Sequence, residues 1–201
     1  MLCLQECDTT DMPANIDELH LADSTKRNRL GLAVYYNRER FTARETKAFE
    51  LKKSLHDRVL TPAHERLIGT KLVDNEDGHE LIVASFHAAP LTALNSLRRK
   101  QISAAYSLLG TMGDNLPTLM VGDYNYPIFK KNLTEHVSGS GYDLSLSDTR
   151  TYTRYKIFRG HYDFVTSSGF AIDNVETLAR GDSDHKPILV SADYAAQRPA
   201  A

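Results

Sequence analysis

The 201-residue sequence lacks several features that mark whole classes of protein. No apolar run approaches the roughly 20 residues that a membrane-spanning helix needs. Only two cysteines are present, Cys3 and Cys7, which are too few for a disulfide framework. A zinc site would need further cysteine or histidine ligands at the right spacing. The first residues carry no basic leader of the kind that opens a signal peptide. We therefore expect a reduced protein of the cytoplasm, without a membrane span.

The chain also lacks an excess of basic residues. The 24 lysines and arginines stand against 26 aspartates and glutamates, so that the net charge is −2. A domain that holds nucleic acid by its overall charge would be basic. A polyanionic substrate would here need a local basic patch and metal ions that offset acidic ligands. Hydrophobic residues make up 41% of the chain, which predicts one domain with a single sizeable core.

The hydrophobic pattern predicts many short strands and few helices. The residues with alternating or continuous apolar character are 2–5, 30–36, 66–73, 80–87, 118–122, 161–167, 171–178 and 186–193. Residues 41–51 fit both a helix capping box and a strand, and we favour the strand. Turn residues 74–78 predict a hairpin between two of these strands. Residues 8–29 are expected to form a loop with a short helix.

Two helices are expected, an amphipathic one at 92–110 and a short one near 127–137. Arg98, Arg99 and Lys100 are interpreted as the solvated face of the first helix, with Arg99 also a candidate substrate contact. A basic loop near 148–160 and a frayed tail at 195–201 complete the chain. Short strands joined by hairpins favour mixed sheets over a doubly wound α/β fold.

Polar residues that can bind metal or transfer protons follow the predicted strands. They are Glu6, His87, Asp123 with Asn125, Asp163, and Asp184 with His185. Strand ends meet at one edge of a sheet, so these side chains can converge although they are scattered in sequence. Each one alone is compatible with a solvated loop residue. Together they indicate a site.

Five segments resemble, in order, the motifs of the endonuclease/exonuclease/phosphatase superfamily. The segments are Leu4-Gln5-Glu6, Ser85-Phe86-His87, Val121-Gly122-Asp123-Tyr124-Asn125, His161-Tyr162-Asp163-Phe164-Val165 and Ser183-Asp184-His185-Lys186-Pro187. The resemblance implies an α/β fold over residues 1–194, a four-layered α/β/β/α sandwich of two mixed, mostly antiparallel sheets. It also implies hydrolysis of a phosphoester with Mg²⁺ or Mn²⁺ as cofactor.

The resemblance assigns the carboxylates to metal binding. Glu6 and Asp184 match metal ligands, and oxygen ligands are those that Mg²⁺ prefers. Asp123 would either activate the attacking water or hold a second ion. Asn125 would hydrogen-bond the water or a phosphate oxygen. Whether one or two ions bind is left open by the sequence.

The resemblance also assigns the histidines to proton transfer. His185 matches a catalytic acid–base, and Asp163 matches the carboxylate that orients it. His87 matches a second histidine that contacts the scissile phosphate or protonates the leaving group. A histidine that only caps its strand is the alternative for His87.

A basic and aromatic stretch bears on the substrate. Between Arg150 and Arg159 four cations alternate with three aromatic residues, and Arg154, Tyr155 and Arg159 are the candidate contacts. Such a stretch suits phosphates and stacked bases, although an edge strand would show the same alternation. We therefore expect a nuclease that acts on DNA or RNA as a monomer. A phosphatase or phospholipase-like enzyme, and a non-catalytic binding domain, are the alternatives.

Members of this superfamily normally begin with a strand that ends in an asparagine near the metal site. Here Met1 falls almost directly on the second strand of that pattern. An internal sheet position left empty would expose unpaired backbone groups. The resemblance thus leads us to expect a longer natural protein.

Overall fold

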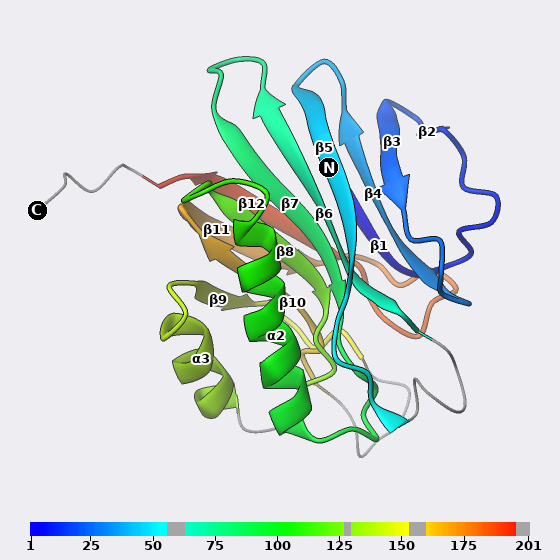
Figure 1. Cartoon of the computed structure of the whole chain (residues 1–201), viewed down its shortest axis with the longest axis vertical. Coiled ribbons are helices and arrows are strands. Elements are labelled where there is room, and N and C mark those ends of the chain that lie inside the picture. Colours follow the sequence, from blue (N-terminus) through cyan, green and yellow to red (C-terminus); the bar gives the residue numbers. More distant parts are fainter. Residues whose placement is uncertain (56–62, 127–129, 153–159, 196–201) are drawn as a thin grey trace, which may run out of the picture.

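The structure is a computed structural model that describes residues 1–55, 63–126, 130–152 and 160–195. Strands dominate, in agreement with the sequence pattern (Figure 1). The strands are β1 (Leu2–Cys7), β2 (Asn15–Ile16), β3 (Leu19–Ser24), β4 (Gly31–Asn37), β5 (Phe41–Glu50), β6 (Glu65–Asp74), β7 (Glu80–His87), β8 (Thr118–Asp123), β9 (Asp143–Leu146), β10 (Asp163–Ser168), β11 (Phe170–Thr177) and β12 (Ile188–Tyr194). The helices are α2 (Asn95–Gly110) and α3 (Lys130–Ser138). Neither of these two helices has the length and apolar composition needed to cross a bilayer.

The described strands form three sheets. The largest has six strands in the order β5-β6-β7-β8-β10-β9, a second has the order β1-β4-β3-β2, and β11 pairs with β12. Among the described strands, β7 and β8 are the one parallel pair. A parallel pair needs a crossover, and α2 supplies it. The expectation of mostly antiparallel strands is confirmed. The described strands form three sheets where two were expected, however, and of these the six-stranded sheet is the mixed one.

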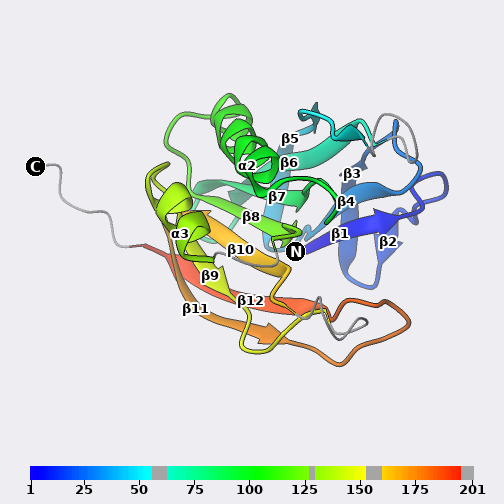
Figure 2. The same cartoon turned by 90° about the horizontal axis from the view of Figure 1, so that it is seen from below.

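The six-stranded sheet is buried on both faces because its central strands are apolar throughout. On β7, Ile82, Ala84 and Phe86 pack with the helices in one core cluster. Leu81 and Val83 point the other way, into a cluster shared with β11 and β12. Figure 2 shows α2 on one side of this sheet and the β11–β12 pair on the other. In the described ranges both helices lie on the side of α2. The second helical layer of the expected α/β/β/α sandwich stays a prediction.

Three segments differ from the sequence-based expectations. Residues 8–29 contain β2 and β3 where we expected a loop with a short helix, because β4 offers β3 a partner edge. The strand β9 at 143–146 was not predicted. The expectation of a solvated Arg98 is wrong, since its side chain is buried in α2, whereas Leu94, expected on the apolar face, is exposed.

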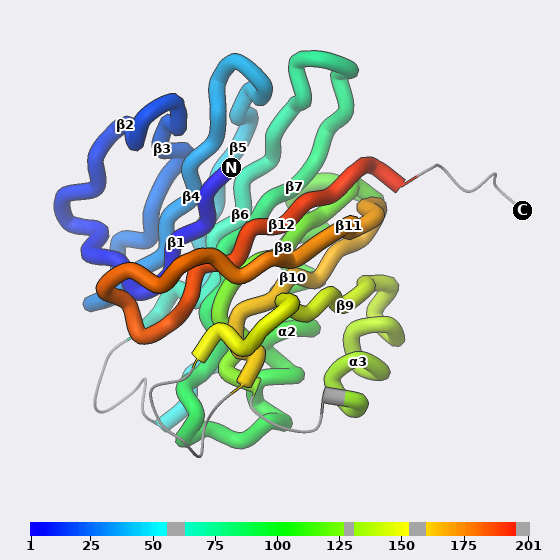
Figure 3. The backbone as a smooth tube through the Cα atoms, turned by 180° about the vertical axis from the view of Figure 1, so that it is seen from behind, coloured from blue at the N-terminus to red at the C-terminus, as the bar shows by residue number. Residues whose placement is uncertain are grey.

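A groove of about 440 Å³ runs between β1 and β12. Each of these strands has one described partner, β4 for β1 and β11 for β12. The groove is lined by residues 1–6 and 188–190, and its apolar floor includes Val83, Leu119 and Val121. Figure 3 shows β1 and β12 on the same face of the molecule. The expected additional strand is neither confirmed nor contradicted by this geometry and stays a prediction.

Candidate active site

Three predicted site residues lie side by side at one edge of the six-stranded sheet. His87 ends β7, Asp123 ends β8 and Asp163 begins the antiparallel β10. Asp123 is in register with His87 on one side and with Asp163 on the other. The three residues therefore lie together as predicted, because they occupy paired positions on adjacent strands.

Gly122 allows β8 to approach β7 closely just before Asp123. Its φ is +152°, and a Cβ at this position would lie 1.9 Å from the carbonyl oxygen of Phe86. Any side chain here would push the two strands apart beside the His87–Asp123 pair. The glycine is therefore part of what places the site residues.

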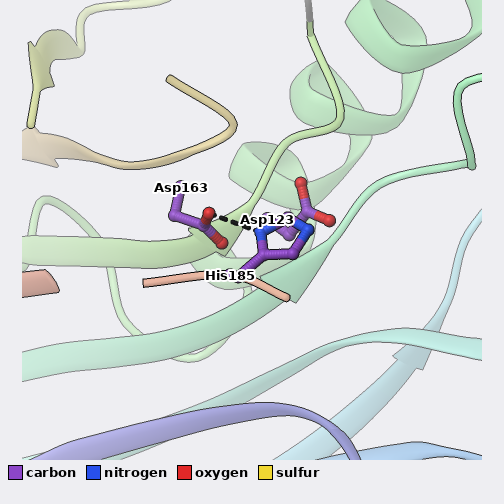
Figure 4. Close-up of side chains that lie close together, drawn as sticks. All are labelled: Asp123, Asp163 and His185. Carbon is purple, nitrogen blue, oxygen red and sulfur yellow. Dashed lines mark hydrogen bonds and ion pairs between the residues drawn. The ribbon is translucent and has the colours of Figure 1, made fainter. Parts of the chain in front are cut away.

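His185 and Asp163 form a hydrogen-bonded dyad. His185 Nδ1 lies 2.6 Å from Asp163 Oδ2, and Figure 4 shows Asp123 beside this pair. Burial acts to lower the pKa of His185. The hydrogen bond and the negative charge of Asp163 outweigh it, with further help from Asp123 and Asp184, and raise the pKa to about 9. The bond through Nδ1 leaves Nε2 to exchange protons with a ligand.

Thr151 joins the two parts of the chain that carry the dyad. Its Oγ1 accepts hydrogen bonds from the amides of Tyr162 and Asp163, each at 3.1 Å. Its carbonyl oxygen accepts one from the amide of Lys186, next to His185, at 2.8 Å. The dyad distance is therefore fixed by backbone hydrogen bonds as well as by the side chains.

Asp123 is a buried carboxyl group. Burial and the neighbouring charge of Asp163 raise its pKa to about 7, against the opposing effect of His185. The backbone amide of Asn125 donates to Asp123 Oδ1 at 2.7 Å and fixes the orientation of the carboxyl group. A carboxyl group whose pKa is near neutrality can take up and release a proton at the pH of the cell.

His87 lies between Asp123 and Glu6. Its Nε2 is 3.8 Å from Asp123 Oδ2 and 3.6 Å from Glu6 Oε1. Both distances exceed those of a direct hydrogen bond. His87 therefore connects the exposed Glu6 with the buried carboxylates and faces the same space as they do.

Two of the predicted site residues have left-handed backbone conformations. Glu6 has φ +53° and Asn125 has φ +48°. Glu6 lies in an irregular part of β1, where the register to β4 shifts between Leu4 and Cys7. A bulge re-aims side chains, and strained residues are found preferentially at functional sites. The strain at Glu6 is thus a second reason to place it in the site.

The side chains around the dyad fit a hard divalent cation. Asp123, Asp163 and His185 each offer a ligand atom, and these atoms lie within 4.8 Å of one another. Glu6 and Asp184, the ligands predicted from the sequence, line the same pocket as Asp123. Carboxylate oxygens are the ligands that Mg²⁺ and Mn²⁺ prefer, and a cation would offset the charge that raises the pKa of Asp123.

One pocket of about 370 Å³ collects most of the predicted site residues. Its lining includes Glu6, His87, Asp123, Asn125, Asp184 and His185. Asp163 lies just behind His185 and lines the β1–β12 groove, together with Glu6, Asp123, Asp184 and His185. The pocket and the groove therefore meet at the dyad.

Of the predicted substrate contacts, His87 and Asn125 line this pocket, and the other four are not among the described residues that line it. Arg99 lies on α2 and donates from Nη1 to the hydroxyl of Tyr126 at 2.7 Å, and it is absent from the pocket lining. Arg154, Tyr155 and Arg159 lie outside the described residues. A role of these four residues in substrate binding stays a prediction.

Sequence reasoning missed two buried arginines that hold the loop after His87. Arg66 donates from Nη1 to the carbonyl oxygens of His87 and Ala88, at 2.9 and 2.8 Å. Arg98 donates to the carbonyl oxygens of Ala89 and Pro90 and to Asn95. Arg66 also lines the pocket and brings a positive charge to its wall. The spacing of Arg98, four residues before Ile102, places it on the buried face of α2, whereas its charge predicts exposure.

The walls of the pocket include aromatic and aliphatic side chains that no motif indicated. Tyr152 and Tyr162 lie beside His185, and Leu30, Leu32 and Leu91 lie elsewhere in the lining. Tyr152 packs on the imidazole of His185, with ring centres 4.8 Å apart. The pocket thus combines a charged end with an apolar wall.

Comparison with known proteins places this geometry in a fold family. No protein-family model and no curated protein matches the sequence. Among solved structures, the human Nocturnin catalytic domain matches with a TM-score of 0.73 and 16% identity, over 96% of this chain and 80% of that one. A Bacteroides thetaiotaomicron mannosyl-6-phosphatase matches with a TM-score of 0.69 and 16% identity, over 89% and 78%. D. rerio TDP2, complexed with a single-strand DNA product, matches with a TM-score of 0.66 and 12% identity, over 88% and 77%.

Further matching structures are described as members of the endonuclease/exonuclease/phosphatase family. These identities are low, whereas the matches extend over most of each chain. The chain therefore has the fold of the endonuclease/exonuclease/phosphatase family.

Proposed function

We propose that this protein is a metal-dependent phosphoesterase that hydrolyses phosphodiester bonds in nucleic acid. The observation that carries the proposal is the His185–Asp163 dyad at 2.6 Å, set beside Asp123. His185 lines one pocket together with Glu6, His87, Asp123, Asn125 and Asp184. In the reaction a water oxygen bonds to phosphorus, the bond to the leaving oxygen breaks, and a proton passes to the leaving alcohol.

A magnesium or manganese ion held by Glu6 and Asp184 would polarise the phosphoryl group. Asp123, which lines the same pocket, would either accept the proton of the attacking water or hold a second ion. Asn125 is held at the same turn and is suited to orient that water or a phosphoryl oxygen. These roles use the side chains that the pocket brings together.

The two histidines would act on the phosphoryl oxygens and on the leaving oxygen. Asp163 keeps the His185 ring fixed and stabilises its protonated form, so His185 carries a positive charge toward the phosphoryl oxygens. His87 is suited to protonate the leaving oxygen. General acid–base help of this kind is typically worth about 10²–10⁴-fold in rate.

Two features favour nucleic acid as the substrate. One neighbour in the same fold, TDP2, is complexed with a single-strand DNA product. The sequence also carries the basic and aromatic stretch that ends at Arg159, directly before the segment of Tyr162 and Asp163. We expect no protein partner for this reaction and a monomeric enzyme.

A small phosphoester is the second candidate substrate. The pocket is only about 370 Å³, and Leu30, Leu32 and Leu91 give it an uncharged wall that suits a compact leaving group. A mannosyl-6-phosphatase with the same fold shows that the fold is compatible with such a substrate. A non-catalytic binding domain is less consistent with the site, because a binder has no need of a buried, hydrogen-bonded histidine–carboxylate dyad.

The proposal is tested by hydrolysis of single- and double-stranded DNA, RNA, a chromogenic phosphodiester and sugar phosphates, with Mg²⁺, with Mn²⁺ and with chelator. We expect metal-dependent cleavage, and His185→Ala should lose it while keeping the fold. His79→Ala is the matched control, because His79 pairs with Asp77 at 2.9 Å on an exposed turn. Turnover that survives both chelation and His185→Ala would rule out the proposal.

A further inference from the structure

Tyr162 is placed against the reacting groups by the same backbone contacts that place the dyad. It directly precedes Asp163, and its amide donates to Thr151 Oγ1. Its side chain is 1% exposed and forms part of the pocket wall. Tyr152 packs edge-on against its ring, with the ring centres 5.4 Å apart and an interplanar angle of 87°. This contact and the burial of the side chain restrict the movement of the ring.

The hydroxyl of Tyr162 is buried, and among the described residues no hydrogen-bond partner lies within reach of it. Other tyrosine hydroxyls of this protein find partners. That of Tyr124 lies 2.8 Å from the carbonyl oxygen of Met120, and that of Tyr35 lies 2.8 Å from the carbonyl oxygen of Pro13. A buried hydroxyl without a partner costs stability, and each such group calls for an explanation.

A positive charge lies near this hydroxyl. The guanidinium of Arg98 is close enough for its charge to act on Tyr162, against the opposing charge of Asp123. Arg98 is buried behind the loop after His87, and Arg66 lines the pocket itself. A protonated phenol is a single, directional donor, and its natural acceptor in such a place is a charged oxygen that enters with the ligand.

We propose that the Tyr162 hydroxyl donates a hydrogen bond to a phosphoryl oxygen of the substrate bound in the pocket of Asp123 and His185. The inference rests on the proposed function and adds a substrate-binding residue to it. The hydroxyl gains its partner only when the phosphoryl group is bound, so the stability lost in the free protein is recovered as affinity for the reacting group. Tyr162 thereby helps to hold the phosphorus beside the dyad.

The test uses Tyr162→Phe, which removes the oxygen and keeps the ring. Tyr106→Phe is the matched control, since the hydroxyl of Tyr106 is also buried but lies in the helix-side core beside Thr166, away from the pocket. We would measure thermal unfolding, kcat and KM on the chromogenic phosphodiester, and the affinity for inorganic phosphate in the presence of Mg²⁺. Phosphate binding does not depend on turnover.

We expect Tyr162→Phe to unfold at the same or a higher temperature than the unmodified protein. Its kcat/KM and its affinity for phosphate should fall by about tenfold to a hundredfold, the value of one hydrogen bond to a charged acceptor. Tyr106→Phe should leave both unchanged. Equal phosphate affinity of the Tyr162→Phe and unmodified proteins would overturn the inference, as would a loss of stability with normal turnover.

The same measurements separate the two proposals. If the unmodified protein cleaves no phosphoester but binds phosphate through Tyr162, the proposed reaction is wrong and the contact stands. If it binds no phosphate at all, the contact is wrong as well. If it cleaves the phosphodiester and the Tyr162→Phe protein does so equally well, only the role of Tyr162 fails.

Discussion

At Glu6 we expect the backbone conformation to decide the stability of variants and the carboxylate to decide their activity. Its φ of +53° is a conformation that side chains with a Cβ adopt at a penalty of about 1–2 kcal/mol. Its carboxylate is 61% exposed and lies 3.6 Å from His87, so this pair contributes roughly 0–1 kcal/mol to stability. The backbone conformation, and not the ion pair, therefore dominates the energetics of the position.

The informative comparison is between Glu6→Ala and Glu6→Gly, because both lose the carboxylate and only glycine relieves the backbone. At ordinary positions glycine is less stable than alanine by roughly 0.5–1 kcal/mol. Here the relief of about 1–2 kcal/mol should reverse the order and leave glycine ahead by about 0.5–1 kcal/mol. In a domain of this size that difference is on the order of 2 °C in Tm. Both variants should require more Mg²⁺ for turnover.

Denaturant unfolding and thermal unfolding of the two variants measure the difference. Lys47, an exposed residue in the regular part of β5, where it pairs with Gly69, is the control position, and there alanine should be the more stable. If glycine is less stable than alanine at position 6 by as much as at position 47, the strain inferred from φ is absent. Normal magnesium saturation of both Glu6 variants would remove Glu6 from the ligand set.

Further predictions concern the dyad, a remote carboxylate and the groove. Asp163→Asn should lower kcat by roughly 10²–10⁴-fold, and should bring the pKa of His185 down toward its ordinary value in an NMR titration. Asp74→Asn should lower the free energy of unfolding at pH 7 by about 1–3 kcal/mol without changing turnover, because Asp74 is 1% exposed and accepts bonds from Arg40 and the amide of Glu76. Burial acts to raise the pKa of Asp74, but these bonds lower it below its unfolded value. The stabilisation is therefore present above the unfolded pKa and lost as the pH falls through the folded one, and Asp74→Asn should flatten acid unfolding in that range. An extension ahead of Met1 with apolar residues at alternate positions should pair in the β1–β12 groove and raise Tm, whereas the same extension with prolines at its hydrogen-bonding positions should not.

The sequence predicted the location of the site better than its surroundings. His87 and Asp123 could be predicted because each ends an apolar run, and Asp163 because an apolar run follows it in an antiparallel strand. These strand ends share one edge of the sheet. Their positions in the fold follow from the local hydrophobic pattern and from the pairing of neighbouring strands. The same holds for β4, β6, β7 and β8, whose apolar runs are bounded by polar or turn residues.

Arg98 shows why the surroundings could not be predicted. The helical period places residues 98 and 101 on the same face as Ile102, Ala105 and Leu109, which predicts burial. Charge predicts exposure, because a buried guanidinium needs several acceptors. The acceptors are the carbonyl oxygens of Ala89 and Pro90, which depend on how the loop after His87 folds. Nothing local to the helix reveals them.

The dyad depends on a similar contact between distant parts of the chain. Asp163 stands at the start of β10 in the six-stranded sheet, whereas His185 belongs to the segment that leads into β12. Thr151 connects the two, since its side chain holds the amide of Asp163 and its carbonyl oxygen holds the amide of Lys186. A motif can name both members of the dyad, but their separation of 2.6 Å follows from a threonine that carries no signal of its own. The chemistry of this site is therefore encoded in short motifs, and its geometry in the backbone contacts between them.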